Sequence, residues 1–308
     1  MMRSNLFLDL VTARVFVSVV EHQSIAEAAR VEGIAASAVS KRIQQLEQEI
    51  GMPLLSRHRR GVEPTNAGLV VLRRARAILH ETVQLDADLA GLRTGLTGRV
   101  RLCANETALI EFVPSILPDF VSSFPGIEVE LEERQSTAVV RAIWQNAADL
   151  GIYVGDVPPV NLWRRPVFQD RLVLVTMPDH ALATKSHVTM EDILQHEVVG
   201  QATEGALSLL LTRAAASYHS VLKMRFFADG YDTVCSLVGR GLAIGIVSDS
   251  AARIFASRFN LTVLPIADRW AIREHEVCVR SLEALAPPQQ AFLDHILRRS
   301  PRGLGPVT

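Results

Sequence analysis

The sequence predicts an α/β protein in which a helical N-terminal region precedes a longer region of alternating strands and helices. Residues 6 to 93 read as almost continuous helix with short breaks. Beyond Gly98, short β-branched runs alternate with helical patterns, which indicates parallel βαβ units. The stretch from Gly95 to Gly98 separates these two patterns, so we place a domain boundary there.

Composition and charge are typical of a folded, water-soluble protein of two or three domains. Of 308 residues, 48% are hydrophobic and 21% are charged. The 32 Lys and Arg balance 33 Asp and Glu to a formal charge of −1, so a nucleic-acid site would need locally concentrated basic residues. The sequence therefore needs to be searched segment by segment for such a concentration.

Cysteine spacing and hydropathy favour a cytoplasmic protein without metal, cofactor or membrane partner. Cys103, Cys235 and Cys278 are an odd number without CxxC spacing, which disfavours a disulfide framework or a zinc site. No apolar stretch reaches the ~18 residues of a membrane span, because Arg240 interrupts the best candidate. Arg14 likewise leaves too short an apolar run for a signal peptide.

The first informative segment is a pair of helices joined by a glycine. Ser24 precedes the helical stretch Ile25 to Val31, and Glu27 follows it by three residues, which predicts a capping box in which each side chain satisfies a backbone N–H. Gly33 is predicted to end this helix, and a second helix runs from Ala35 to Ile50.

The second helix of this pair has an apolar and a polar face. At about 100° per residue, one stripe is predicted to be buried: Val39, Ile43, Leu46 and Ile50. The opposite stripe is predicted to face outward: Ser37, Lys41, Gln44 and Gln48. An outward face with hydrogen-bonding groups and a positive charge, but no acid, suits a helix in a DNA major groove. The alternative is an ordinary solvated helix face.

Basic residues concentrate around this helix. Between residues 41 and 76 there are eight Lys and Arg against three Glu. The short polar tract from Ser56 to Gly61 suits a wing between two small strands, and its Arg57, Arg59 and Arg60 could reach phosphates or an adjacent minor groove. Such phosphate contacts would make DNA binding steeply dependent on salt.

These residues resemble the winged helix-turn-helix of LysR-type transcriptional regulators. The matching segments, in order, are Ser24–Ala29, Ser37–Ile43, Leu46–Glu47, Gly51–Leu55, Arg57 and Pro64–Gly68. The resemblance implies a recognition helix from about Ala36, a wing near 56–63, and a long dimerising linker helix after Thr65. It also implies that the α/β region is a two-lobed effector domain resembling periplasmic binding proteins, which agrees with the strand pattern.

The resemblance assigns a role to each part of the chain. It implies a DNA-binding domain at 6–64, a linker helix at 65–93, and an effector domain at 98–301 whose lobes are about 98–169 with 272–301, and 170–271. The DNA-contacting residues that we expect are Ala35, Ala36, Ser37, Ser40, Lys41, Arg42, Gln44, Arg57, Arg59 and Arg60. Two departures from the family pattern stand out. Glu32 replaces a usual leucine, so it must pack differently or turn outward, and Ala35 and Ala36 replace polar residues.

The linker helix carries a candidate dimer seam. Thr65 can cap it, and its apolar residues recur near heptad spacing at Leu72, Ala75, Leu79, Val83 and Leu89. Such a seam implies a partner helix in a homodimer or homotetramer, while packing on the chain's own domain is the alternative.

The α/β region offers four loops for a ligand. Its predicted strands are Val100–Ala104, Ile127–Leu131, Leu150–Val154, Leu172–Met177, Glu197–Val199, Met224–Phe227, Ala243–Val247, Leu261–Leu264 and Glu276–Arg280. In open α/β sheets, ligands bind beyond the carboxyl ends of strands, at helix N-termini. The residues that we expect there are Asn105, Glu106, Thr107, Ser136, Thr137, Thr203, Glu204, Gly205, Tyr231, Asp232 and Thr233. Plain helix capping is the alternative for each hydroxyl residue.

These patterns predict a sequence-specific regulator of transcription that binds double-stranded promoter DNA and a small-molecule effector. The alternative is a small-molecule-binding or transport-type protein whose helical region mediates only association. The sequence contains no GxSxG, HExxH or P-loop motif, so an enzyme is disfavoured. Glu106 and Glu204 would disfavour a carboxylate effector, which leaves a neutral or cationic group as the alternative.

Overall fold

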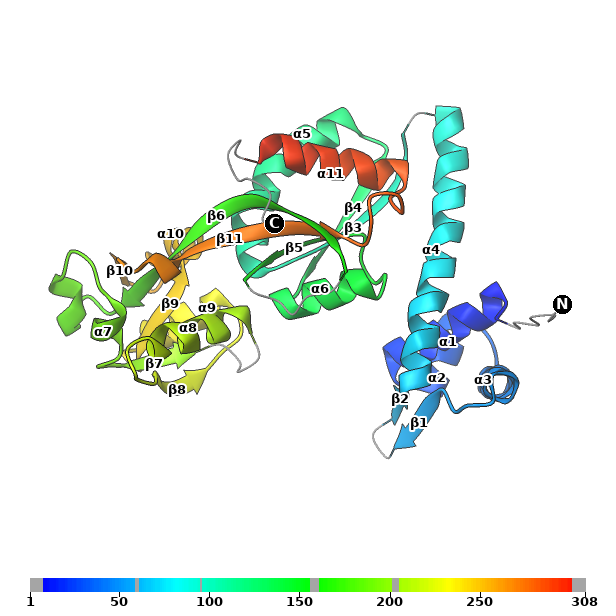
Figure 1. The fold of residues 1–308 in the computed structure, drawn as a ribbon, viewed down its shortest axis with the longest axis horizontal. Helices are drawn as coiled ribbons and strands as arrows, with labels where there is room; N and C mark the ends of the chain where they lie inside the picture. The colour runs from blue at the N-terminus through cyan, green and yellow to red at the C-terminus, as the bar shows by residue number, and fades with distance from the viewer. Residues whose placement is uncertain (1–7, 59–60, 95, 156–160, 201–204, 301–308) are drawn as a thin grey trace. The chain divides into compact units, whose positions relative to one another are not determined.

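The computed structural model describes residues 8–58, 61–94, 96–155, 161–200 and 205–300. The chain forms two compact units (Figure 1): an N-terminal unit of residues 1–98 with 145–147, and a C-terminal unit of 99–144 with 148–308. Among the described residues, no helix combines the length and hydropathy that a membrane span needs.

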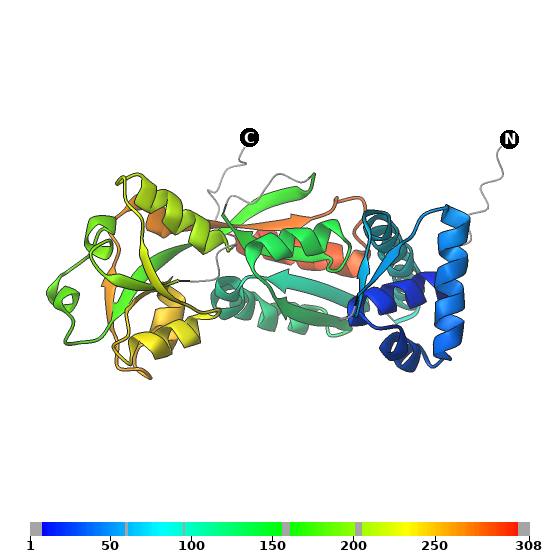
Figure 2. The same ribbon diagram turned by 90° about the horizontal axis from the view of Figure 1, so that it is seen from below.

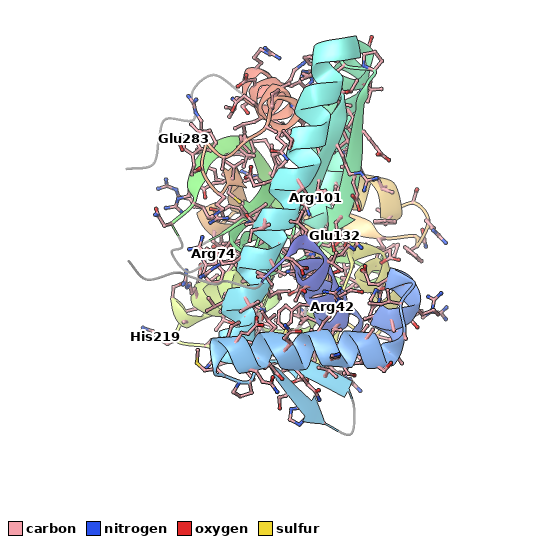
Figure 3. All side chains as sticks on the ribbon, turned by 90° about the vertical axis from the view of Figure 1, so that its right-hand side faces the viewer. Arg42, Arg74, Arg101, Glu132, His219 and Glu283 are labelled. Carbon is pink, nitrogen blue, oxygen red and sulfur yellow. The ribbon has the colours of Figure 1, made fainter. Side chains whose placement is uncertain are left out.

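The N-terminal unit is a bundle of helices with a two-stranded hairpin. Its elements are α1 (Leu10–His22), α2 (Ile25–Glu32), α3 (Ala36–Ile50), β1 (Leu55–His58), β2 (Gly61–Pro64) and α4 (Asn66–Thr94). The two strands pair antiparallel from Leu55 opposite Pro64 to His58 opposite Gly61. Phe16, Val39 and Ile43 are buried at the centre of the core that the helices share. Figure 3 shows α3 crossing one end of α4, with the hairpin beyond it.

The turn from α2 to α3 follows the sequence pattern with one difference. The Ser24 hydroxyl accepts a hydrogen bond from the backbone N–H of Glu27 at 3.2 Å. The Glu27 carboxylate, however, bonds to the guanidinium of Arg30 one turn later at 2.6 Å, so the reciprocal half of the expected capping box is replaced by an ion pair. Gly33 ends α2 at a φ of 66°, a left-handed conformation that glycine adopts without strain.

The seam that we expected on α4 faces the unit's own core. Leu72 and Ala75 are buried against α1, and Leu79 packs on the same cluster. The side chains of Val83 and Leu89 lie outside the described residues. The alternative that the pattern left open, packing on the chain's own domain, therefore holds for the first half of this seam. Helical spacing identified the buried stripe, but spacing alone does not say which partner covers it.

The C-terminal unit is built on a nine-stranded mixed sheet. Eight strands follow the order β4 (Ile127–Glu133), β3 (Gly98–Ala104), β5 (Leu150–Val154), β11 (Ile272–Val279), β6 (Trp163–Thr176), β9 (Ile244–Ser248), β7 (Glu197–Gly200) and β8 (Lys223–Phe227). The ninth strand, β10 (Thr262–Pro265), pairs with β6. The larger helices are α5 (Val113–Ser123), α6 (Ser136–Trp144), α8 (Ala206–Ala216), α9 (Tyr231–Val238) and α11 (Pro287–Arg299). The shorter helical segments are η1 (Ala108–Phe112), η2 (Ala181–Thr184), α7 (Met190–Ile193), α10 (Asp249–Phe255) and η3 (Arg269–Ala271).

Two long strands join the two lobes of this unit. β6 and β11 pair antiparallel along their length, with Arg273 opposite Asp170. Figure 2 shows the lobes end to end with helices flanking their strands. β3 and β5 are parallel, as are β7 with β8 and with β9, whereas β11 and β6 run antiparallel to their neighbours. Each predicted strand overlaps an observed one, but β6 begins nine residues earlier than the predicted Leu172.

Candidate functional site

The outward face of α3 is the first candidate site. Val39, Ile43 and Leu46 are each at most 3% exposed, so the opposite stripe is forced outward. Its members are exposed: Ser37, Lys41, Gln44 and Gln48. Ala35 and Ala36 are also exposed, and Ala35 caps the helix without a side-chain hydrogen bond. The first turn of α3 therefore presents backbone N–H groups without a side-chain cap.

The helix that precedes α3 is held by an unexpected ion pair. The carboxylate of Glu32, at the end of α2, lies 2.7 Å from the guanidinium of Arg14 on α1. Its side chain is only 10% exposed. Of the two alternatives for Glu32, different packing rather than an outward turn is the one that the structure adopts.

A second acid fixes the position of the hairpin relative to α3. The Glu47 carboxylate accepts hydrogen bonds from the backbone N–H groups of Leu54 and Leu55, at 2.8 and 3.1 Å. The Thr65 hydroxyl donates to the carbonyl of Pro53 and accepts from the N–H of Gly68 at the start of α4. The hairpin is thus tied to both helices. Arg59, Arg60 and the side chain of Arg57 lie outside the described residues.

Arg42 differs from the other expected DNA-contacting residues. Its guanidinium donates to the Thr12 hydroxyl at 3.1 Å and lies 3.6 Å from the Asp9 carboxylate, so it points toward the start of α1 (Figure 3). Asp9 in turn caps α1 by accepting from the N–H of Thr12. Ser40 is half-buried on α3. The outward stripe therefore includes Lys41 but not Arg42.

The second candidate site is a cavity between the two lobes of the C-terminal unit. It has a volume of about 90 Å³ and brings together parts of all four expected loops. The expected residues that line it are Asn105, Glu106, Ser136, Gly205 and Tyr231. Ser136 is buried, and its hydroxyl accepts a hydrogen bond from the N–H of Val154. The rule that ligands bind beyond strand ends thus selects loops that do converge.

The remaining expected residues lie elsewhere. Thr107 is fully buried and does not line the cavity; its hydroxyl is 3.2 Å from the Tyr231 hydroxyl. Asp232 and Thr233 are exposed and hydrogen-bond to each other. Thr137 is half-buried next to Ser136 and does not line the cavity. Thr203 and Glu204 lie outside the described residues.

A larger cavity of about 350 Å³ adjoins the first one. The two share four lining residues: Val154, Ala206, Leu207 and Arg273. The larger cavity is further lined by Leu210 and Arg213 of α8 and by Arg164 and Glu276 of the crossing strands. Sequence reasoning missed these residues because it searched only loops at strand ends. The two crossing strands, whose N-terminal halves were not recognised, supply much of the second cavity.

Glu106 links the two lobes across the smaller cavity. It follows β3 in one lobe, and its carboxylate Oε1 accepts from the backbone N–H of Tyr231, the first residue of α9 in the other lobe, at 2.8 Å. Burial raises the pKa of Glu106 to about 7, and this N–H bond only partly offsets it. The chain's own carboxylate therefore occupies the N-terminus of α9, a position that would otherwise attract an anion.

A buried charge cluster lies where the strands cross between the lobes. The Arg273 guanidinium contacts both oxygens of Asp170 and donates to the Thr107 hydroxyl at 3.2 Å. The side chains of Arg273 and Asp170 are 5% and 2% exposed. The fully buried His275 ring lies 3.3 Å from Asp170.

Burial and charge shift the pKa values of this cluster in different directions. Burial by itself raises the pKa of Asp170, but His275 and Arg273 outweigh it, so that the pKa falls below its usual value. Burial lowers the pKa of His275. The cluster is thus a fixed ion pair beside a neutral imidazole, which anchors the lobe junction rather than supplying a reactive group.

Comparisons with known proteins cover both units. Residues 10–69 match a family model described as a bacterial regulatory helix-turn-helix protein of the LysR family, and residues 93–301 match the LysR substrate binding domain. The HTH-type transcriptional regulator CbbR of Rhodospirillum rubrum is 28% identical, over 91% of this chain and 93% of that protein.

Two solved structures share the fold at low sequence identity. A full-length variant of OxyR from Pseudomonas aeruginosa superposes with a TM-score of 0.71 at 16% identity, over 95% of this chain and 94% of that one. Full-length CbnR complexed with its target DNA superposes with a TM-score of 0.69 at 18% identity, over 95% of this chain and all of that one. At these identities the likeness concerns the fold alone.

Proposed function

The chain belongs to the LysR family of transcriptional regulators, and from that membership we propose that it binds promoter DNA through the outward face of α3 and is controlled by a small molecule bound between the lobes. We assign DNA binding to residues 6–64, dimerisation to 65–93 and effector binding to 98–301. Regulators of this family are not enzymes, and we propose the same for this chain, acting in the cytoplasm.

One observation carries the DNA-binding proposal: α3 buries its apolar stripe and exposes Ser37, Lys41 and Gln44 beside a hairpin held at a fixed position. A glutamine can pair with the edge of an adenine, and a lysine with a guanine or a phosphate. The uncapped first turn of α3 adds N–H groups that suit a phosphate oxygen. An association domain needs none of these features.

We propose that a second α4 covers a stripe displaced from the one that the sequence suggested. Ile78 and Leu85 lie seven residues apart on α4 and are 37% and 58% exposed. Residues spaced by seven lie on one side of a helix, and the described residues of α4 that pack on the N-terminal core, Val71 among them, do not include these two. Apolar side chains at heptad spacing favour a partner helix.

Effector control would act through the two crossing strands. β6 and β11 connect the lobes, and the cavity lies beside them, so a ligand that contacts both lobes would favour one separation of the lobes over another. A dimer whose lobes change separation would present its two α3 helices to DNA with a different spacing.

The test is to recover genomic fragments bound by the full chain and to footprint one of them. We expect protection of two half-sites in adjacent major grooves, and loss of base selectivity at one position of each half-site in Gln44→Ala. Gln195→Ala, on the exposed surface of the C-terminal unit, is the matched control. Protection that is unchanged in Gln44→Ala would contradict the assigned face, and absence of any protected fragment would contradict the function.

A further inference from the structure

The smaller cavity between the lobes has an unused hydrogen-bond acceptor. Asn105 lines it and is 8% exposed, and its side-chain oxygen Oδ1 accepts no hydrogen bond from any residue that the structure describes. Leaving a buried amide oxygen without a partner is unfavourable, and such atoms in native proteins usually have one. The missing partner must be a hydrogen-bond donor.

The two arginines that line the same cavity pair with acids and not with Asn105. Arg273 contacts Asp170, Thr107 and the Tyr231 hydroxyl. Arg134 contacts Glu132 through two of its nitrogens, at 2.7 and 2.6 Å. Neither guanidinium donates a hydrogen bond to Asn105 Oδ1.

Carboxylates make up the other charged groups that line the smaller cavity. Glu106, Glu133 and Asp229 line the cavity, and each of the two lining arginines has its own acid, Asp170 or Glu132, as a partner. Glu106 uses Oε1 for the backbone N–H of Tyr231, and this contact fills the N-terminus of α9. A ligand anion would meet negative charge here, and the helix N-terminus that could attract it is occupied.

We propose that the effector carries a protonated amino group, which enters the smaller cavity and donates hydrogen bonds to Asn105 Oδ1 and to the Glu106 carboxylate. This inference rests on the proposed effector function of the cleft. An ammonium group has three donors and no acceptor, which matches two adjacent acceptors and a surplus of negative charge. The body of the ligand lies in the adjoining larger cavity, against Leu207 and Leu210.

The environment of Glu106 adds a dependence on pH. Burial raises its pKa to about 7; the nearby Glu133 and Asp232 also raise it, whereas the Tyr231 N–H and Arg273 lower it. An ammonium group beside Glu106 favours the ionised carboxylate, so the bound state has a lower Glu106 pKa than the free state. Amine binding therefore strengthens as the pH rises from 6 to 8 and releases a proton.

Matched fragments provide the test. We would measure binding to the full chain by ligand-observed NMR at millimolar concentration, using benzylamine, benzyl alcohol and benzoate, and in parallel butylamine, butanol and butyrate. At pH 8, we expect each amine to bind more tightly than its alcohol and its carboxylate. At pH 6, we expect the same amine to bind several-fold more weakly than at pH 8. Glu106→Gln keeps an acceptor for the Tyr231 N–H but loses the charge, so it should weaken amine binding about tenfold.

Further variants separate the roles of the two acceptors from general effects. Asn105→Ala should weaken amine binding several-fold, whereas Glu130→Gln, on the exposed edge of the sheet, should leave it unchanged. The pH profile of the unaltered chain stands even if a variant fails to fold. Tighter binding of a carboxylate than of its amine, or equal amine binding in Glu106→Gln and the unaltered chain, would overturn the inference while leaving the cleft a ligand site.

Absence of binding by every fragment would overturn the inference and also remove support for effector binding in the cleft. The DNA-binding half of the proposed function would be untouched, because it is measured separately on promoter fragments.

Discussion

The α3 face of the N-terminal unit and the lobe junction of the C-terminal unit use their charged side chains in opposite ways. In the N-terminal unit, Lys41 and the polar residues beside it on α3 are exposed. In the C-terminal unit, the charged groups at the lobe junction are buried, with Arg273 and Asp170 at most 5% exposed. The outward face of α3 leaves its lysine available to a partner, whereas the lobe junction pairs its charged groups with one another.

This difference separates charged side chains that are available to bind a partner from charged side chains that stabilise the fold. An exposed lysine contributes little to folding, so its loss affects binding. A buried charge that loses its partner destabilises the fold strongly. Arg42 lies between these extremes, because it is on α3 but contacts Asp9 and Thr12 of the chain itself.

The largest effect is expected at the lobe junction. Arg273→Met leaves the Asp170 carboxylate buried beside a methionine, so we expect the free energy of unfolding of the C-terminal unit to fall by about 3–5 kcal/mol. Urea unfolding at pH 7 measures it. Arg225→Met, which breaks the exposed ion pair with Glu197, is the control and should change the value by less than about 1 kcal/mol. Similar losses in both variants would contradict the contrast between buried and exposed charges.

A second comparison concerns the two apolar stripes of α4. Leu72 is 5% exposed, so Leu72→Ala should lower the free energy of unfolding of the N-terminal unit by about 2–5 kcal/mol. Leu85 is 58% exposed, so Leu85→Asp should leave unfolding of that unit nearly unchanged but weaken self-association. Sedimentation of both variants, together with urea unfolding, separates the two effects. A dimer that persists unchanged in Leu85→Asp would exclude the stripe of Ile78 and Leu85 as the interface.

The stripes of α4 also show how far the sequence could be used to predict this fold. Spacing placed the helix boundaries and the inward face of α3 well, because the period of a helix is a local property. It assigned Leu72 and Leu79 to a partner because nothing in the sequence says which of two apolar surfaces is covered by α1. The same limit applies to the basic residues. Counting from residue 41 to 76 omitted Asp9, which caps α1 and pairs with Arg42, and Glu21 of α1, which pairs with Arg76.

The third prediction concerns pH and the smaller cavity. A carboxyl group whose pKa rises from its usual 4.5 to about 7 on folding binds its proton more tightly in the folded state. Stability from this source is therefore present below about pH 4.5 and is lost as the pH rises through 7. Glu106→Gln cannot ionise, so the variant does not lose this stability. Between these two pH values, the free energy of unfolding of the variant should therefore rise relative to that of the unaltered chain, by about 1–2 kcal/mol after discounting for partial exposure.

The measurement is urea unfolding at a series of pH values, taken as the difference between the variant and the unaltered chain. Taking the difference cancels the contribution of His275 to the pH dependence of stability. Its lowered pKa contributes in the opposite sense over part of the same pH range. Glu130→Gln serves as the exposed control. A flat difference between pH 4.5 and 7 would mean that folding does not raise the pKa of Glu106.

The candidate site was predictable to the extent that it depends on strand ends. Asn105, Glu106, Ser136 and Tyr231 follow or begin local elements that the sequence reveals, and they meet in one cavity. Arg164 and Arg273 belong to long crossing strands whose polar residues, Arg164, Arg165 and Gln169 among them, obscure the strand pattern. Their partners are distant in sequence, as Asp170 is from Arg273, so that only the tertiary fold reveals the pairing.

Salt dependence of operator binding tests the role of the exposed α3 face most directly. Anisotropy titrations of a recovered promoter fragment between about 50 and 200 mM salt give the slope of log affinity against log salt. We expect Lys41→Ala to lower affinity and flatten the slope by about one per protomer, because one phosphate contact is lost. Arg42→Ala should flatten it less, because that guanidinium contacts Asp9 and Thr12. An unchanged slope in Lys41→Ala, or an equal change in both variants, would contradict the assignment of DNA recognition to this face.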